Sequence, residues 1–180
     1  MRITLATKLT LLRVLLVIPF MYTALDDRGI MQTAALVIFV IASFTDFLDG
    51  KVARMMNEVT TLGKFVDQLA DKILIDAALL VFLQLGEVGS WFVITVITRD
   101  IAVSGLRMMA AANMRVIAAS WWGKMKTVSQ MTFVIVLLLY NVNPFLGETL
   151  NVVLMWIAFA MTVVSGIDYF VKNREALEES

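Results

Sequence analysis

The sequence predicts an all-α integral membrane protein with six transmembrane helices and both termini in the cytoplasm. Of its 180 residues, 60% are apolar and 17% are charged, whereas soluble domains are about 45–50% apolar and about 25% charged. The mean hydropathy is +0.84. The apolar residues gather in six stretches, most of them near the length of about 20 residues that a spanning helix needs.

These stretches define the expected elements in chain order. They lie at about residues 9–25, 30–47, 65–86, 89–111, 127–142 and 149–171. Ordinary turn signals fall in three of the connections: Asp26-Asp27-Arg28-Gly29, Gly86-Glu87-Val88-Gly89 and Asn141-Val142-Asn143-Pro144. Short connections leave no room for an independent soluble domain, so we expect residues 1–180 to form a single membrane domain.

The distribution of basic residues sets the expected orientation. Eleven of the 15 Lys and Arg residues lie outside the apolar stretches, and ten of these fall at the termini and in the second and fourth connections. Only Arg28 lies on the opposite side. Because cytoplasmic loops are enriched in Lys and Arg, both termini and the even connections are expected in the cytoplasm.

Composition also restricts the chemistry. The chain contains no Cys and no His, which excludes disulfides, Cys/His zinc sites, thiol nucleophiles and histidine-dependent phosphodiesterase chemistry. Catalysis would therefore rest on carboxylates, basic residues, hydroxyls or a bound metal.

The densest polar segment follows the second apolar stretch. If this segment is helical, five residues fall on one face at i, i+3, i+4, i+7 and i+8: Asp46, Asp49, Gly50, Ala53 and Arg54. Charges at membrane depth are costly and usually mark a site or a pathway. The two small residues would let a ligand approach the helix backbone, and the arginine could hold a phosphate.

A second polar face begins the third apolar stretch, where Gly63, Asp67 and Asp71 are spaced by four residues. If the two faces meet, four carboxylates come together, and each raises the pKa of the others unless a cation balances them. Oxygen ligands without nitrogen or sulfur favour a hard divalent ion, magnesium or else manganese or calcium. This combination is typical of a site for a metal-bound phosphate ester or anhydride.

From Asp46 to Asp71 the sequence reads D-x2-D-G-x2-A-R-x8-G-x3-D-x3-D. This pattern resembles the signature of the CDP-alcohol phosphotransferases at every defined position. The resemblance implies the fold of that family, with six transmembrane helices, a homodimer and a polar cavity facing the cytoplasm. It implies that Asp46, Asp49, Asp67 and Asp71 bind two divalent metals, Mg²⁺ or Mn²⁺, and that Asp71 is also the catalytic base. The implied site for the cytidine diphosphate group contains Thr10, Asp49, Gly50, Ala53, Arg54 and Gly63.

Basic residues further along the chain favour an anionic acceptor. They are Arg99, Arg107, Arg115, Lys124 and Lys126, and together they would bind the phosphate of a phosphorylated alcohol. Asp100 could pair with Arg107, because the two share a helix face at i and i+7. Internal ion pairing and positive-inside anchoring are the alternative roles for these side chains.

Three segments narrow the resemblance to the phosphatidylglycerophosphate synthase branch: Leu9 to Arg13, Arg99 to Arg107, and Ser120 to Thr127. The resemblance implies transfer of the phosphatidyl group from CDP-diacylglycerol to glycerol 3-phosphate, with release of CMP. It also implies a multi-pass enzyme of a bacterial cytoplasmic membrane, in contact with membrane lipids and without a nucleic acid partner. Other acceptors, such as inositol phosphate, serine or another alcohol, remain alternatives, and a cation transporter is the alternative from another class.

Overall fold

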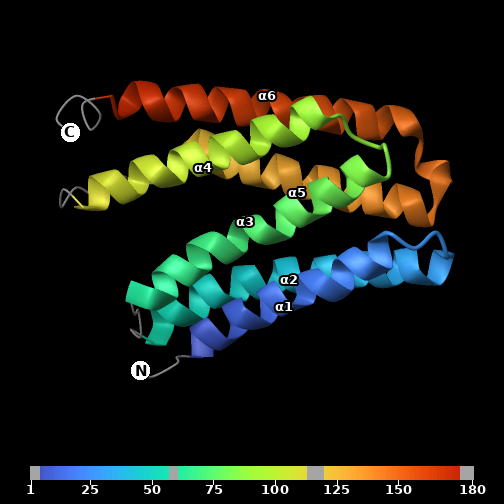
Figure 1. Cartoon of the computed structure of the whole chain (residues 1–180), viewed down its shortest axis with the longest axis horizontal. Coiled ribbons are helices and arrows are strands. Elements are labelled where there is room, and N and C mark those ends of the chain that lie inside the picture. The colour runs from blue at the N-terminus through green and yellow to red at the C-terminus, as the bar shows by residue number, and fades with distance from the viewer. Residues whose placement is uncertain (1–4, 57–60, 113–119, 175–180) are drawn as a thin grey trace. The chain divides into compact units, whose positions relative to one another are not determined.

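The computed structural model describes the backbone of residues 5–56, 61–112 and 120–174, and the side chains of residues 10–45, 72–111, 120–145 and 147–174. The described backbone contains six α-helices, one short 3-10 helix and no strand (Figure 1). The elements are α1 (Leu5–Ala24), α2 (Gly29–Met56), α3 (Thr61–Gln84), α4 (Ser90–Ala112), α5 (Trp121–Val142), η1 (Pro144–Leu146) and α6 (Glu148–Lys172).

The all-helical prediction is confirmed, and each of the six expected stretches corresponds to one helix. Within the described residues, α5 and α6 are long and apolar enough to cross a membrane by length and composition. Shorter apolar segments cover residues Thr10–Ala24 of α1 and Gly29–Thr45 of α2. That all six helices span a membrane stays a prediction.

Two helices extend furthest beyond the apolar pattern. Helix α2 continues to Met56, about nine residues beyond the expected end, because charged residues end an apolar run without ending a helix. Helix α5 begins at Trp121 rather than near residue 127. Ser120 precedes it and accepts a hydrogen bond from the Gly123 N–H at 3.1 Å, which is the geometry of a helix N-cap.

Contacts divide the chain into two compact units. Unit 1 comprises Met1–Glu87 and Val134–Leu146, and unit 2 comprises Val88–Phe133 and Gly147–Ser180.

In unit 1, α1 packs against both α2 and α3 (Figure 1). The buried positions of α1 recur every three or four residues, as helical packing requires: Thr10, Arg13, Val17, Phe20 and Ala24. The ring of Phe20 lies 5.6 Å from that of Phe39 on α2.

In unit 2, α4 packs against α6, and side chains of α5 join both helices. The rings of Phe92 on α4 and Phe133 on α5 meet edge to face at 5.7 Å. On the α6 side, the buried amide of Gln130 donates to Thr162 Oγ1 at 3.0 Å. Burial of these groups is tolerable because the hydroxyl accepts this hydrogen bond and itself donates to Ala158 O at 2.7 Å.

The connections within unit 1 have well-defined local causes. Gly86 follows α3 with φ +77°, and Glu87 N donates to Phe82 O at 2.9 Å, which together form a Schellman ending. Between α1 and α2, the Arg28 guanidinium and N–H bond the Asp26 carboxylate. These hydrogen bonds lower the pKa of Asp26 to about 2.

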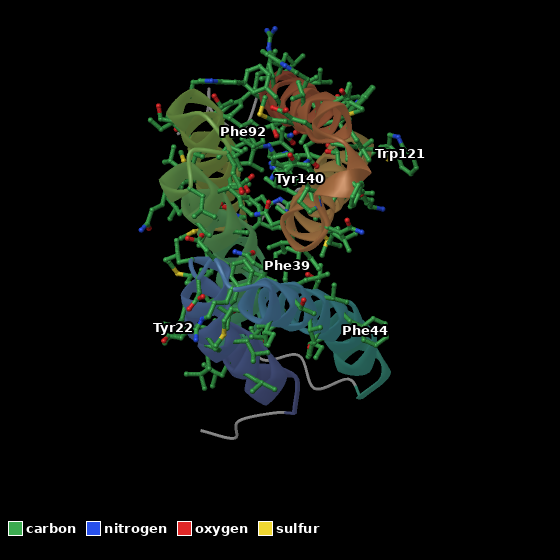
Figure 2. All side chains as sticks on the ribbon, turned by 90° about the vertical axis from the view of Figure 1, so that its right-hand side faces the viewer. Tyr22, Phe39, Phe44, Phe92, Trp121 and Tyr140 are labelled. Atoms are coloured by element: carbon green, nitrogen blue, oxygen red, sulfur yellow. The ribbon has the colours of Figure 1, made fainter. Side chains whose placement is uncertain are left out.

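Large aromatic side chains lie on the outside of both units. Tyr22, Phe44 and Trp121 are each more than half exposed within the described structure (Figure 2). Water is a poor solvent for such rings, whereas lipid and the membrane interface accept them.

Candidate functional site

The acidic motif lies on two helices of unit 1. Its first half, from Asp46 to Arg54, is within α2, and its second half, from Gly63 to Asp71, is within α3. The helical backbone assumed for both segments is therefore confirmed. Met56 and Thr61 are five residues apart, so their Cα atoms lie at most about 18 Å apart. Helices α2 and α3 also contact each other directly.

The side chains of the motif lie outside the described residues. This holds for Asp46, Asp49, Gly50, Ala53, Arg54, Gly63, Asp67 and Asp71. Among the described residues, no group of three or more acidic, His or Cys side chains could hold a metal ion. The metal prediction therefore depends on the donor chemistry of four aspartates and on the register of their helices.

On α2, the register relates the motif to the packed core of unit 1. Ala35, Phe39 and Ala42 are fully buried and are spaced by four and three residues. Continued along the helix, this spacing reaches positions 46, 49, 50 and 53.

The same relation holds on α3. Helix α3 is buried on more than one face, and three of its buried residues, Ile75, Ala78 and Phe82, share a face that leads back, by helical spacing, to positions 71, 67 and 63. The faces of α2 and α3 that pack in unit 1 thus continue into the motif positions.

Polar residues are also buried on α1 and on the part of α2 that precedes the motif. On α1, Thr10 is 2% exposed and Arg13 is 1% exposed, and on α2 Ser43 is 9% exposed. Thr10 is the one expected nucleotide-binding residue whose side chain the structure describes, and it lies on the packed face of α1. Arg13 lies on the same packed face of α1, three residues further along the helix.

Unit 2 contains the described part of the expected acceptor site. The Lys126 ammonium on α5 lies 2.6 Å from Asp100 Oδ2 and 2.8 Å from Oδ1 on α4. Arg99 Nη1 also donates to Asp100 Oδ1, at 3.1 Å. The side chains of Lys126 and Asp100 are nearly completely buried, and that of Arg99 is 13% exposed.

Two glycines make room for Arg99. A Cβ atom added at Gly166 on α6 would lie 3.3 Å from Arg99 Cγ, and one added at Gly123 on α5 would lie 3.7 Å from Arg99 Nη2. The first distance is tighter than an ordinary van der Waals contact. Arg99 is therefore enclosed by backbone from α5 and α6.

Arg107 has a different partner from the one expected. Its Nε donates to the hydroxyl of Tyr169 on α6 at 2.8 Å, and its guanidinium carbon lies 5.4 Å from the centre of the Tyr169 ring. The expected pairing of Asp100 with Arg107 is wrong: the ion pairs of Asp100 described here are with Arg99 and Lys126. Lys126 from α5 reaches the Asp100 carboxylate. Residue spacing along α4 alone contains no information about this contact.

The remaining basic residues are less constrained. Lys124 is exposed in the second turn of α5, and Arg115 lies outside the described residues. The structure thus brings Arg99 and Lys126 together around Asp100 and places Arg107 against α6.

Sequence reasoning missed the contribution of α6. Thr162, Ser165 and Tyr169 are all buried and are spaced by three and four residues, so they form a buried polar stripe on a mainly apolar helix. That spacing was the available signal.

Comparison with known proteins agrees with the motif. The family model of CDP-alcohol phosphatidyltransferase matches residues 3–164. The chain is 40% identical over 190 residues to a CDP-diacylglycerol–glycerol-3-phosphate 3-phosphatidyltransferase of Bacillus subtilis, covering 98% of both chains.

Two further relatives point the same way. A probable phosphatidylglycerophosphate synthase of Mycobacterium tuberculosis is 38% identical, covering 92% of this chain and 79% of the relative. A CDP-diacylglycerol–glycerol-3-phosphate 3-phosphatidyltransferase of Haemophilus influenzae is 36% identical, covering 89% and 88%. With the family model spanning most of its length, this chain belongs to the CDP-alcohol phosphatidyltransferase family.

Proposed function

We propose that this chain is a membrane enzyme that transfers the phosphatidyl group from CDP-diacylglycerol to glycerol 3-phosphate and releases CMP. Family membership and the names of the relatives support the two substrates. The observation that carries the proposal is the register of α2 and α3, whose packed faces continue into the motif positions.

In this proposal, Asp46, Asp49, Asp67 and Asp71 hold two Mg²⁺ or Mn²⁺ ions. The donor set fits, because carboxylate oxygens are the ligands that hard divalent ions prefer. When bound, such ions neutralise charge on a diphosphate and on the departing CMP. Asp71 accepts the proton of the acceptor hydroxyl, as a general base must.

The cytidine diphosphate group is proposed to lie against the small and basic residues of the same region. Gly50, Ala53 and Gly63 leave space for a ligand near the helix backbones, Asp49 and Arg54 contact it, and Thr10 supplies a hydroxyl from α1. The burial of Thr10 beside the charged Arg13 supports a polar region on this face.

The acceptor phosphate is proposed to bind the basic residues of unit 2: Arg99, Arg107, Arg115, Lys124 and Lys126. In addition to this proposed role, Lys126 and Arg99 both bond Asp100, which holds the two cations close together. Arg107 and the exposed Lys124 provide charge for direct contact with a phosphate.

We further propose that the chain acts as one catalytic domain with six membrane spans, cytoplasmic termini and a cytoplasmic active site, and that it forms a homodimer. The apolar helices α5 and α6 and the exposed aromatic side chains support membrane insertion. The distribution of Lys and Arg supports the orientation.

The test is CMP release by the purified protein in detergent micelles supplied with CDP-diacylglycerol. We expect release to require both glycerol 3-phosphate and Mg²⁺ and to stop when a chelator is added. Full activity in the chelator would contradict the metal sites. Faster release with inositol phosphate or serine would reassign the acceptor, and cation flux without CMP release would refute the transferase.

A further inference from the structure

Tyr169 holds Arg107 without neutralising it. The Tyr169 side chain is 2% exposed and packs in a buried cluster with Val103 and Leu106 of α4. Its hydroxyl accepts the hydrogen bond from Arg107 Nε at 2.8 Å, and its ring lies beside the guanidinium. Because the cluster fixes the ring, the ring in turn fixes the plane of the guanidinium.

The chemistry of the partner matters here. Arg99 and Lys126 are held by a carboxylate, which balances their charge. Among the described residues Arg107 has no carboxylate partner, and a phenol carries no charge at neutral pH. Arg107 is therefore oriented while it keeps its full positive charge.

The hydrogen bond also selects which edge of the guanidinium remains available. A guanidinium can bind an oxyanion in two ways, through Nε with one terminal nitrogen or through both terminal nitrogens. Tyr169 occupies Nε, so only the pair of terminal nitrogens can bind a phosphate with two parallel hydrogen bonds.

We propose that Tyr169 is a positioning residue for the acceptor, which sets Arg107 so that its two terminal nitrogens bind the phosphate of glycerol 3-phosphate. This inference rests on the proposed function. Tyr169 does not contact the reacting atoms, and its effect passes through Arg107.

The test compares Tyr169→Phe with Tyr169→Leu. The Phe variant keeps the packed ring and loses only the hydroxyl, so its thermal unfolding temperature should stay close to that of the wild type. One hydrogen bond has a net value that corresponds to about a 2- to 10-fold change in binding. We expect the KM for glycerol 3-phosphate to rise by about that factor, with the KM for CDP-diacylglycerol and kcat unchanged. The Leu variant also loses the ring, so its KM for glycerol 3-phosphate should rise further.

Two controls separate positioning from a structural role. Tyr140→Phe removes a hydroxyl from the end of α5 that belongs to unit 1, whereas Arg107 belongs to unit 2, and should leave every kinetic constant unchanged. In an Arg107→Ala background, Tyr169→Phe should cause no further rise in the KM for glycerol 3-phosphate, because the group it positions is gone.

The outcomes distinguish this inference from the proposed function. An unchanged KM for glycerol 3-phosphate in Tyr169→Phe, or an equal rise with and without Arg107, would overturn the positioning role and leave the function intact. A wild-type enzyme that does not use glycerol 3-phosphate would overturn both.

Discussion

Lys126 on α5 and Asp100 on α4 form a buried ion pair, with the ammonium within 2.8 Å of both carboxylate oxygens. Arg99 contacts the same carboxylate. Taking charges out of water is costly, and the cost is recovered only when each charge keeps a close partner. The pair therefore links α4 to α5 strongly only while both partners are present.

The first prediction concerns the loss of one partner of this ion pair. Asp100→Asn takes this carboxylate away from the buried Lys126 and the half-buried Arg99, and should lower the free energy of unfolding by about 3–5 kcal/mol. Lys126→Met should cost less, because Asp100 keeps its contact with Arg99. The double variant should be more stable than Asp100→Asn alone. Thermal unfolding in detergent measures all three.

The exposed pair of Asp26 with Arg28 provides the control. Asp26→Asn removes a carboxylate at the surface, where water and salt screen the interaction, and should leave the unfolding temperature almost unchanged. If Asp26→Asn and Asp100→Asn change the unfolding temperature equally, burial of the Asp100–Lys126 pair has no energetic importance.

The contrast between α2 and α4 shows what the sequence can reveal. The motif spacing correctly indicated helices through Asp46 and Asp71, because spacing along one chain segment reports which residues share a helix face. The partner of Asp100 depends on which helix packs beside it, and spacing along α4 contains no information about α5. The sequence therefore allows internal ion pairing as an alternative role for Lys126, but it does not identify Asp100 as the partner.

Tyr169 was missed for a related reason. On its own, a tyrosine near the end of an apolar helix is typical of an interfacial anchor. Its contact with Arg107, 62 residues away, exists only after α4 and α6 pack. The predicted end of α2 differs from the observed end by about nine residues. The charges of the motif end the apolar pattern near residue 47, while the backbone of α2 remains helical to Met56.

The second prediction concerns the proposed base. Asp71→Asn keeps the size of the side chain and removes its ability to accept a proton, so kcat should fall by at least about 100-fold while nucleotide binding is partly retained. Binding of CMP and the rate of CMP release would be measured on the same preparation. Asp27→Asn, in the turn between α1 and α2, is the matched control and should keep full activity. CMP release at the wild-type rate from Asp71→Asn would exclude it as the base.

The third prediction compares two glycines inside helices. Gly105 on α4 has open space where a Cβ would lie, whereas a Cβ at Gly166 would lie 3.3 Å from Arg99 Cγ. Gly105→Ala should stabilise the protein by about 0.5–1 kcal/mol through helix propensity. Gly166→Ala should give no such gain, and Gly166→Val should cost about 1–3 kcal/mol because it displaces Arg99. Unfolding temperatures that rise equally in both Ala variants would show that Arg99 is not confined.

The fourth prediction concerns pH and the turn after α3. Asn141 Nδ2 donates to Glu87 Oε1 at 2.8 Å. Glu87 is exposed at the surface, but partial desolvation of its carboxyl raises its pKa above the ordinary value of 4.5, and the hydrogen bond from Asn141 opposes this shift. The folded protein thus binds the Glu87 proton more tightly than the unfolded chain does. Stability from this group is therefore fully present below pH 4.5 and is lost as the pH rises through the raised pKa.

Glu87→Gln should remove this dependence. The Gln side chain cannot ionise, and its carbonyl can still accept the hydrogen bond from Asn141, so the variant should be at least as stable as the wild type at neutral pH. At pH values above 4.5, the unfolding temperature of the wild type should fall as the pH rises. The unfolding temperature of Glu87→Gln should fall less over the same pH range. Glu148→Gln, in the exposed first turn of α6, should keep the wild-type slope. If Glu87→Gln also keeps that slope, the loss of stability with rising pH does not come from Glu87.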